Sequence, residues 1–100
     1  MSARDAKRHL DRVAALGCVV CRNEGLGETP ASAHHINCHA MARKASDYET
    51  IPLCPAHHQD ADGTRKYGGH IAVHRGLETW EERYGTEREL LAQTLRELGL

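Results

Sequence analysis

Two short motifs with the same spacing constrain the fold of this chain more than any other feature. Cys18 and Cys21 are separated by two residues, and so are Cys54 and His57. Three thiols and one imidazole, supplied as two pairs from separate segments, are typical of a tetrahedral zinc site. Such a site can contribute a folding free energy on the order of 10 kcal/mol, comparable with the whole stability of a small domain. We therefore predict a structural zinc ion that joins the two segments.

The composition indicates that the fold needs the stabilisation that such a metal site provides. It has 100 residues, of which 27% are charged, with no Phe, one Trp and three Tyr. This length favours one domain over residues 1–100, with few large side chains to fill its core. The charged first residues lack the apolar stretch of a secretory signal, and no apolar run has membrane-spanning length. We therefore expect a cytoplasmic protein without membrane contact, whose four cysteines stay reduced.

A second zinc scheme uses the first two cysteines together with His34 and His39, at the spacing of a DNA-reading zinc finger. Such a finger needs a helix that leads into its histidines. Residues 22–30 lack the aromatic and apolar anchors of that helix, and the second motif would have no role. We rank this scheme second and interpret Cys38 and His39 as loop residues.

Local signals predict a small α+β fold. Ser2 can cap the first helix and Gly17 can end it, whereas Pro55 suits the first position of a helix after Cys54. Thr86 and Glu89 have the spacing of a capping box. The first expected elements are a helix over residues 3–16, a cysteine knuckle at 18–21 and a hairpin of strands at 33–36 and 47–53. They are followed by a helix over 56–61, a helix over 71–84 that is interrupted or bent at Gly76, and a last helix that ends before residue 99.

Histidines occur in two adjacent pairs, His34-His35 and His57-His58. Neighbouring side chains differ in direction by about 100° on a helix and lie on opposite faces of a strand. His57 can therefore face the zinc while His58 faces elsewhere. His34 and His35 must also differ in role, so that one suits a second metal ion and the other a substrate beside it.

These motifs resemble the HNH endonucleases of the ββα-metal type: a Cys-x2-Cys pair, His-His on a strand, and Pro-Leu-Cys-x2-His-His leading into a helix. Residues 46–58, with Val73-His74 and residues 82–85 downstream, are similar to the phage recombination-enhancement (Ref-like) nucleases. The resemblance covers about residues 18–85. It implies a zinc-stapled ββα-metal (HNH) core in that range, flanked by helices within residues 1–17 and 86–100.

The resemblance also implies roles for single residues. It makes His35 the general base, and it assigns the catalytic metal to three histidines: His34, His58 and His74, with His70 as the alternative to the last. The middle Asn of the family has no clear match here. Asp47 lies nearest that role, and Asn37 is the weaker candidate. This difference from the family pattern affects the residue that orients His35 and leaves the metal ligands unchanged.

The residue types suit hydrolysis of a phosphodiester bond. A neutral imidazole, with a pKa of about 6.5, can take a proton from water near neutral pH. A metal ion stabilises the charge that develops on the phosphate and the departing oxygen. An all-imidazole set suits Mn²⁺, Ni²⁺ or Zn²⁺ better than Mg²⁺. We therefore expect a second divalent metal besides the structural zinc.

The expected partner is DNA. The net charge is −1, but basic residues cluster locally, and among them Arg43 and Lys44 are the predicted substrate contacts. No segment is typical of a base-reading helix, so we expect low sequence specificity. The resemblance implies dependence on a recombinase–DNA filament and a phage- or prophage-type protein in a bacterial host.

Two other functions were weighed. A non-enzymatic zinc module that binds nucleic acid or protein is the alternative, with His35 and His58 as structural residues. A zinc nucleobase deaminase is excluded, because its His-x-Glu and Pro-Cys-x2-Cys motifs are absent.

Overall fold

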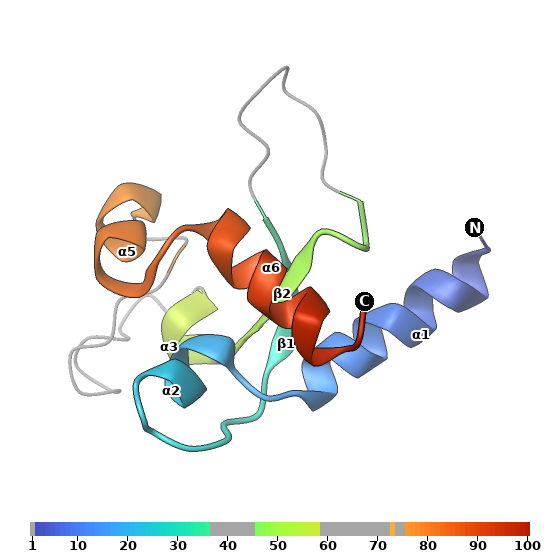
Figure 1. Ribbon diagram of the computed structural model, residues 1–100, viewed down its shortest axis with the longest axis horizontal. Helices are drawn as coiled ribbons and strands as arrows, with labels where there is room; N and C mark the ends of the chain where they lie inside the picture. Colours follow the sequence, from blue (N-terminus) through green and yellow to red (C-terminus); the bar gives the residue numbers. More distant parts are fainter. Residues whose placement is uncertain (1, 37–45, 59–72, 74–75) are drawn as a thin grey trace.

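The structure, a computed structural model, describes residues 2–36, 46–58, 73 and 76–100. Figure 1 shows the arrangement of its helices and strands. In chain order these are α1 (Ala3–Ala15), α2 (Val19–Asn23), β1 (Ser32–His35), β2 (Thr50–Leu53), α3 (Pro55–His58), α5 (Leu77–Tyr84) and α6 (Glu87–Glu97). This confirms the α+β class, with a two-stranded sheet and helices around it.

The predicted hairpin is present as an antiparallel pair of β1 and β2, in which His34 lies opposite Ile51 and His35 opposite Thr50. Every residue of β2 is buried, because α1, α2, α3 and α6 all pack against it. In Figure 1 the hairpin lies at the centre and α6 crosses in front of it. The hairpin therefore forms the platform on which the functional side chains are placed.

The first helix begins and ends where the sequence predicts. The Ser2 hydroxyl accepts the backbone N–H of Asp5, and Gly17 turns the chain with a φ of +81°. That left-handed conformation is open to glycine at low cost. Directly after it, the backbone N–H of Cys18 donates to the carbonyl oxygen of Thr29 at 3.0 Å. The turn at the end of α1 thus leads directly into the first cysteine motif.

His9 is an unexpected member of the buried face of α1. Its side chain is 4% exposed, its ring centroid lies 4.6 Å from that of Tyr48, and its Nε2 has no hydrogen-bond partner among the described residues. Burial lowers the pKa of His9, Arg12 adds to this effect, and Asp47 opposes it. A charged His9 is therefore disfavoured in the folded protein.

A pH-dependent stability follows from this histidine. The pKa of His9 lies lower in the folded state than in the unfolded chain, so its contribution to stability is lost as the pH falls below about 6.5. We expect the melting temperature of His9→Phe, relative to that of the wild type, to increase as the pH is lowered from 7.5 to 5.5. These two pH values lie roughly one unit on either side of 6.5. Both proteins share the metal ligands, so acid loss of metal cancels in the comparison. A margin independent of pH would contradict this expectation.

The last two helices close the core. Trp80 of α5 is fully buried, and α6 buries Leu90 and Leu91 beneath it. The predicted capping box of Thr86 and Glu89 starts α6. Within the predicted helix over 71–84, α5 begins only at Leu77, after Gly76 as its N-cap, which agrees with the interruption expected at that glycine. Residues 71, 72, 74 and 75 lie outside the described part, and so does the rest of the helix predicted over 56–61 beyond residue 58.

The far end of α6 is attached to α2. Arg22 donates to both carboxylate oxygens of Glu97, at 2.8 and 3.0 Å, and holds the pKa of Glu97 below its ordinary value. Asn23 and Gln93 exchange two side-chain hydrogen bonds beside this pair. The last helix is thereby fixed to the segment that carries the first cysteine motif. In the part of the chain that the structure describes, no helix has the length and apolar character to span a membrane.

Candidate metal centre and the adjoining histidines

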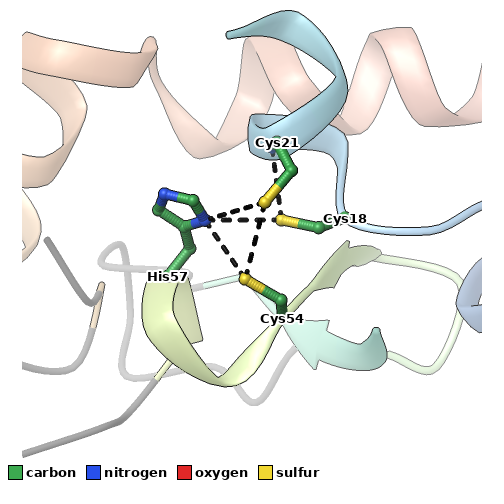
Figure 2. A group of neighbouring side chains, drawn as sticks. All are labelled: Cys18, Cys21, Cys54 and His57. Atoms are coloured by element: carbon green, nitrogen blue, oxygen red, sulfur yellow. Dashed lines mark hydrogen bonds between the residues drawn. The ribbon is translucent and has the colours of Figure 1, made fainter. Parts of the chain in front are cut away.

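The four predicted zinc ligands lie together in the interior. Figure 2 shows Cys18 and Cys21 approaching from one segment and Cys54 and His57 from the other. All four side chains are buried, and their ligand atoms lie within 4.8 Å of one another. The predicted knuckle is a short helix, α2, with Cys18 as its N-cap. This Cys3His cluster could hold a structural metal ion such as zinc.

The local backbone explains why these side chains converge. The Cys21 backbone N–H donates to the Cys18 sulfur at 3.4 Å, so both sulfurs lie at the start of α2. The Cys54 carbonyl oxygen accepts the N–H of His57, which closes the turn from β2 into α3. The ring of His57 also packs edge-on against Tyr84 of α5, with 5.0 Å between centroids. These contacts hold the four side chains in positions from which their ligand atoms face one another.

The separations between the ligand atoms fit one tetrahedral ion. The Nδ1 atom of His57 lies 3.3 Å from the sulfur of Cys54, 3.5 Å from that of Cys21 and 3.6 Å from that of Cys18, and the sulfurs of Cys21 and Cys54 are 3.7 Å apart. Bonds of about 2.3 Å to sulfur and 2.0 Å to nitrogen give edges of roughly 3.5 Å between N and S and 3.8 Å between two sulfurs. These four of the six edges agree with these values, and the other two are no longer than 4.8 Å.

The electrostatics of the cluster also call for a cation. The hydrogen bond with Cys18 lowers the pKa of Cys54 to about 3, with His57 acting in the same direction. The same hydrogen bond and burial raise the pKa of Cys18, and burial raises that of Cys21. A divalent cation allows all three sulfurs to be deprotonated ligands.

His34 and His58 meet beside the Cys3His cluster. The ring centroids of these two histidines are 4.9 Å apart in an edge-on arrangement. His57 and His58 therefore diverge, because the Nδ1 atom of His57 faces the cysteines while the His58 ring contacts His34. His74 and its alternative His70 lie outside the described residues, so the third ligand of the second metal stays a prediction.

His35 lies on the opposite face of β1 and contacts Asp47. Its Nε2 atom is 2.7 Å from Oδ1 of Asp47, and the two side chains are 46% and 44% exposed. The Thr50 hydroxyl donates to the Asp47 carbonyl oxygen and fixes the turn that carries the carboxylate. The geometry is that of a solvent-accessible His–Asp pair, and its catalytic role stays a prediction. The other candidates between β1 and β2 lie outside the described residues, within 37–45: Asn37, Cys38, His39, Arg43 and Lys44.

Sequence reasoning missed Glu87. This residue opens α6, is 3% exposed, and places its Oε2 atom 2.6 Å from Nε2 of His34. The first turn of α6 holds two glutamates, of which the capping box needs only Glu89. Glu87, which the capping box does not need, was the one indication in the sequence of a further role. Nothing in the sequence linked it to His34, which lies 53 positions earlier.

Comparison with known proteins gives one family. A family model described as recombination enhancement, RecA-dependent nuclease matches residues 2–98. The match includes the first and last helices, which lie outside the resemblance noted for residues 18–85. A search of curated proteins gives no match.

Proposed function

This chain belongs to the family of recombination-enhancement, RecA-dependent nucleases, and on that premise we propose that it is an HNH-type endonuclease that hydrolyses DNA phosphodiester bonds with a second divalent metal ion. The observation that carries the proposal is the divergence of His57 and His58. One imidazole completes the Cys3His cluster, and the next contacts His34, away from the cysteines. The scaffold ion and a reactive ion can thus be held by consecutive residues.

In this proposal the second ion is held by His34 and His58, with His74, or alternatively His70, as the third ligand. An ion bound there supplies Lewis-acid stabilisation of charge on the phosphate. Two of these rings are already in contact in the described part of the chain, which supports the assignment. Imidazole ligands favour Mn²⁺, Ni²⁺ or Zn²⁺ over Mg²⁺.

His35 is proposed as the general base and Asp47 as the residue that orients it. When the Asp47 carboxylate accepts the Nε2 proton of His35, the lone pair of the ring lies on Nδ1. That atom can take a proton from the attacking water, and the carboxylate stabilises the imidazolium that results. Asp47 thus takes the place of the Asn that the resemblance leaves unmatched.

The proposed substrate is DNA bound by a RecA filament, with little recognition of sequence by this chain itself. The family description names RecA dependence, which supports the choice of partner. Arg43 and Lys44 are the proposed phosphate contacts. The proposed location is the cytoplasm of a bacterial host, where such a filament forms, and a phage- or prophage-type origin is proposed from the resemblance alone.

A plasmid-cleavage assay tests the proposal and its metal preference. Zinc-loaded protein is incubated with naked DNA and with RecA-coated DNA, in Mn²⁺, Ni²⁺ or Mg²⁺ and with no added ion. We expect cleavage of the RecA-coated substrate in Mn²⁺ or Ni²⁺, because imidazole ligands favour these ions, and weaker cleavage in Mg²⁺. Strong cleavage in Mg²⁺ with none in Mn²⁺ would contradict the all-imidazole ligand set.

The alternative function is a zinc-binding module without catalytic activity. The buried pair of His34 and Glu87 favours it, since such a pair can be a purely structural contact. DNA binding by folded, zinc-loaded protein, with no cleavage under any of the divalent ions, would support this alternative over the nuclease.

A further inference from the structure

We propose that Glu87 is the positioning residue for His34 at the second metal site. In this inference, which rests on the proposed function, the Glu87 carboxylate accepts the Nε2 proton of His34 and thereby presents Nδ1 of that ring to the metal. Glu87 is not itself a ligand. The last helix, α6, becomes part of the site although it contributes no ligand atom.

The distance between the two side chains separates a hydrogen bond from shared coordination. Two bonds of about 2.0 Å to one ion would hold a nitrogen and an oxygen roughly 2.8 Å or more apart, even at a right angle. Nε2 of His34 and Oε2 of Glu87 are 2.6 Å apart. The Cys3His cluster of the same structure, by contrast, shows edges of 3.3 to 3.7 Å. The pair therefore has the geometry of a short hydrogen bond.

The environment of Glu87 keeps its side chain in place beside His34. Glu87 is the first residue of α6, where the helix dipole favours a negative charge. Its backbone N–H donates to Oε2 of Glu81 at 2.8 Å, which fixes the start of the helix. Both side chains of the His34–Glu87 pair are almost fully buried, with exposures of 6% and 4%. Little water competes for the hydrogen bond.

The tautomer of His34 follows from this contact. A carboxylate can only accept, so Nε2 must carry the proton, and the lone pair of a neutral ring lies on Nδ1. A carboxylate on the far nitrogen of a metal-binding histidine orients the ring and raises its basicity, and loss of such a partner typically weakens metal binding by 10- to 100-fold. The His58 ring, 4.9 Å from that of His34, lies where a second ligand is needed.

Glu87→Gln tests the inference, with Glu89→Gln as the matched control two residues along the same helix. A glutamine at 89 can still accept the capping hydrogen bond from Thr86. On zinc-loaded full chain, Mn²⁺ affinity is measured by electron paramagnetic resonance, together with zinc content and melting temperature. We expect Glu87→Gln to retain one zinc and to bind Mn²⁺ 10- to 100-fold more weakly. Glu89→Gln should match the wild type, and Glu87→Asp should recover part of the affinity.

The outcomes separate this inference from the proposed function. If the wild type binds no ion beyond the zinc, the second metal of the proposed function fails. If it binds Mn²⁺ and Glu87→Gln binds it equally well, the positioning role of Glu87 is wrong. Should Glu87→Gln not fold, the tautomer of His34 in the wild type decides instead, by ¹⁵N nuclear magnetic resonance of the ring. Protonation at Nε2 supports the inference, and protonation at Nδ1 overturns it.

Discussion

Replacing Cys54 with serine is expected to leave the chain without a stable fold at 25 °C. Cys54 lies between β2 and α3 and is 2% exposed, so it joins the hairpin to the cysteines of the first motif. Loss of the ion removes a free energy on the order of 10 kcal/mol from a domain whose whole stability is about 5 to 15 kcal/mol. The described core has one large aromatic residue, Trp80, that is fully buried, and it has little to offset this loss.

Zinc content and circular dichroism measure the effect of Cys54→Ser. Cys38→Ser is the matched control, since the fourth cysteine has no part in the proposed zinc site. The control should keep one zinc per chain and the wild-type melting temperature. A folded Cys54→Ser protein that retains zinc, or loss of zinc from the control, would show that the ligands are assigned incorrectly.

His35→Ala is expected to lower the cleavage rate by about 10²- to 10⁴-fold, the usual contribution of a positioned general base. Because the His35 side chain is 46% exposed, its removal should change the stability by no more than about 0.5 kcal/mol. Zinc and Mn²⁺ binding should be unchanged, since His34 and His58 remain. The effect should therefore appear in kcat rather than in KM or in metal affinity.

Asp47→Asn and His39→Ala accompany His35→Ala in the same single-turnover assay. Asp47→Asn keeps the shape of the residue that contacts His35 and should reduce the rate by less than His35→Ala does. His39→Ala removes a histidine from the loop between the strands that has no proposed role, and it should leave the rate unchanged. Undiminished cleavage by His35→Ala would exclude this residue as the base.

The parts of the fold that the sequence predicted correctly are those with local signals. Ser2 caps α1, Thr86 and Glu89 cap α6, and Pro55 opens α3, because each acts on backbone groups within one turn. The Cys3His cluster joins distant segments, yet its spacing and ligand types are specific enough to pair them.

The parts that were missed depend on how helices pack against the hairpin. The burial of His9 requires α1 to lie over Tyr48, and the partner of His34 requires the start of α6 to lie beside β1. Neither position follows from local spacing, since the two members of each pair lie far apart in the chain. The short helix after Cys18 was predicted as a tight turn, because Val19 and Val20 gave no helical pattern of useful length.

The two attachments of α6 have a consequence for protein engineering. Its first residue, Glu87, contacts His34, and its last residue, Glu97, binds Arg22, next to Cys21. A chimera cut at the loop before this helix would therefore carry over a hairpin and a cysteine cluster but leave behind the residue that orients one of the histidines. A graft onto another scaffold should therefore include the whole stretch from the first cysteine motif through residue 97.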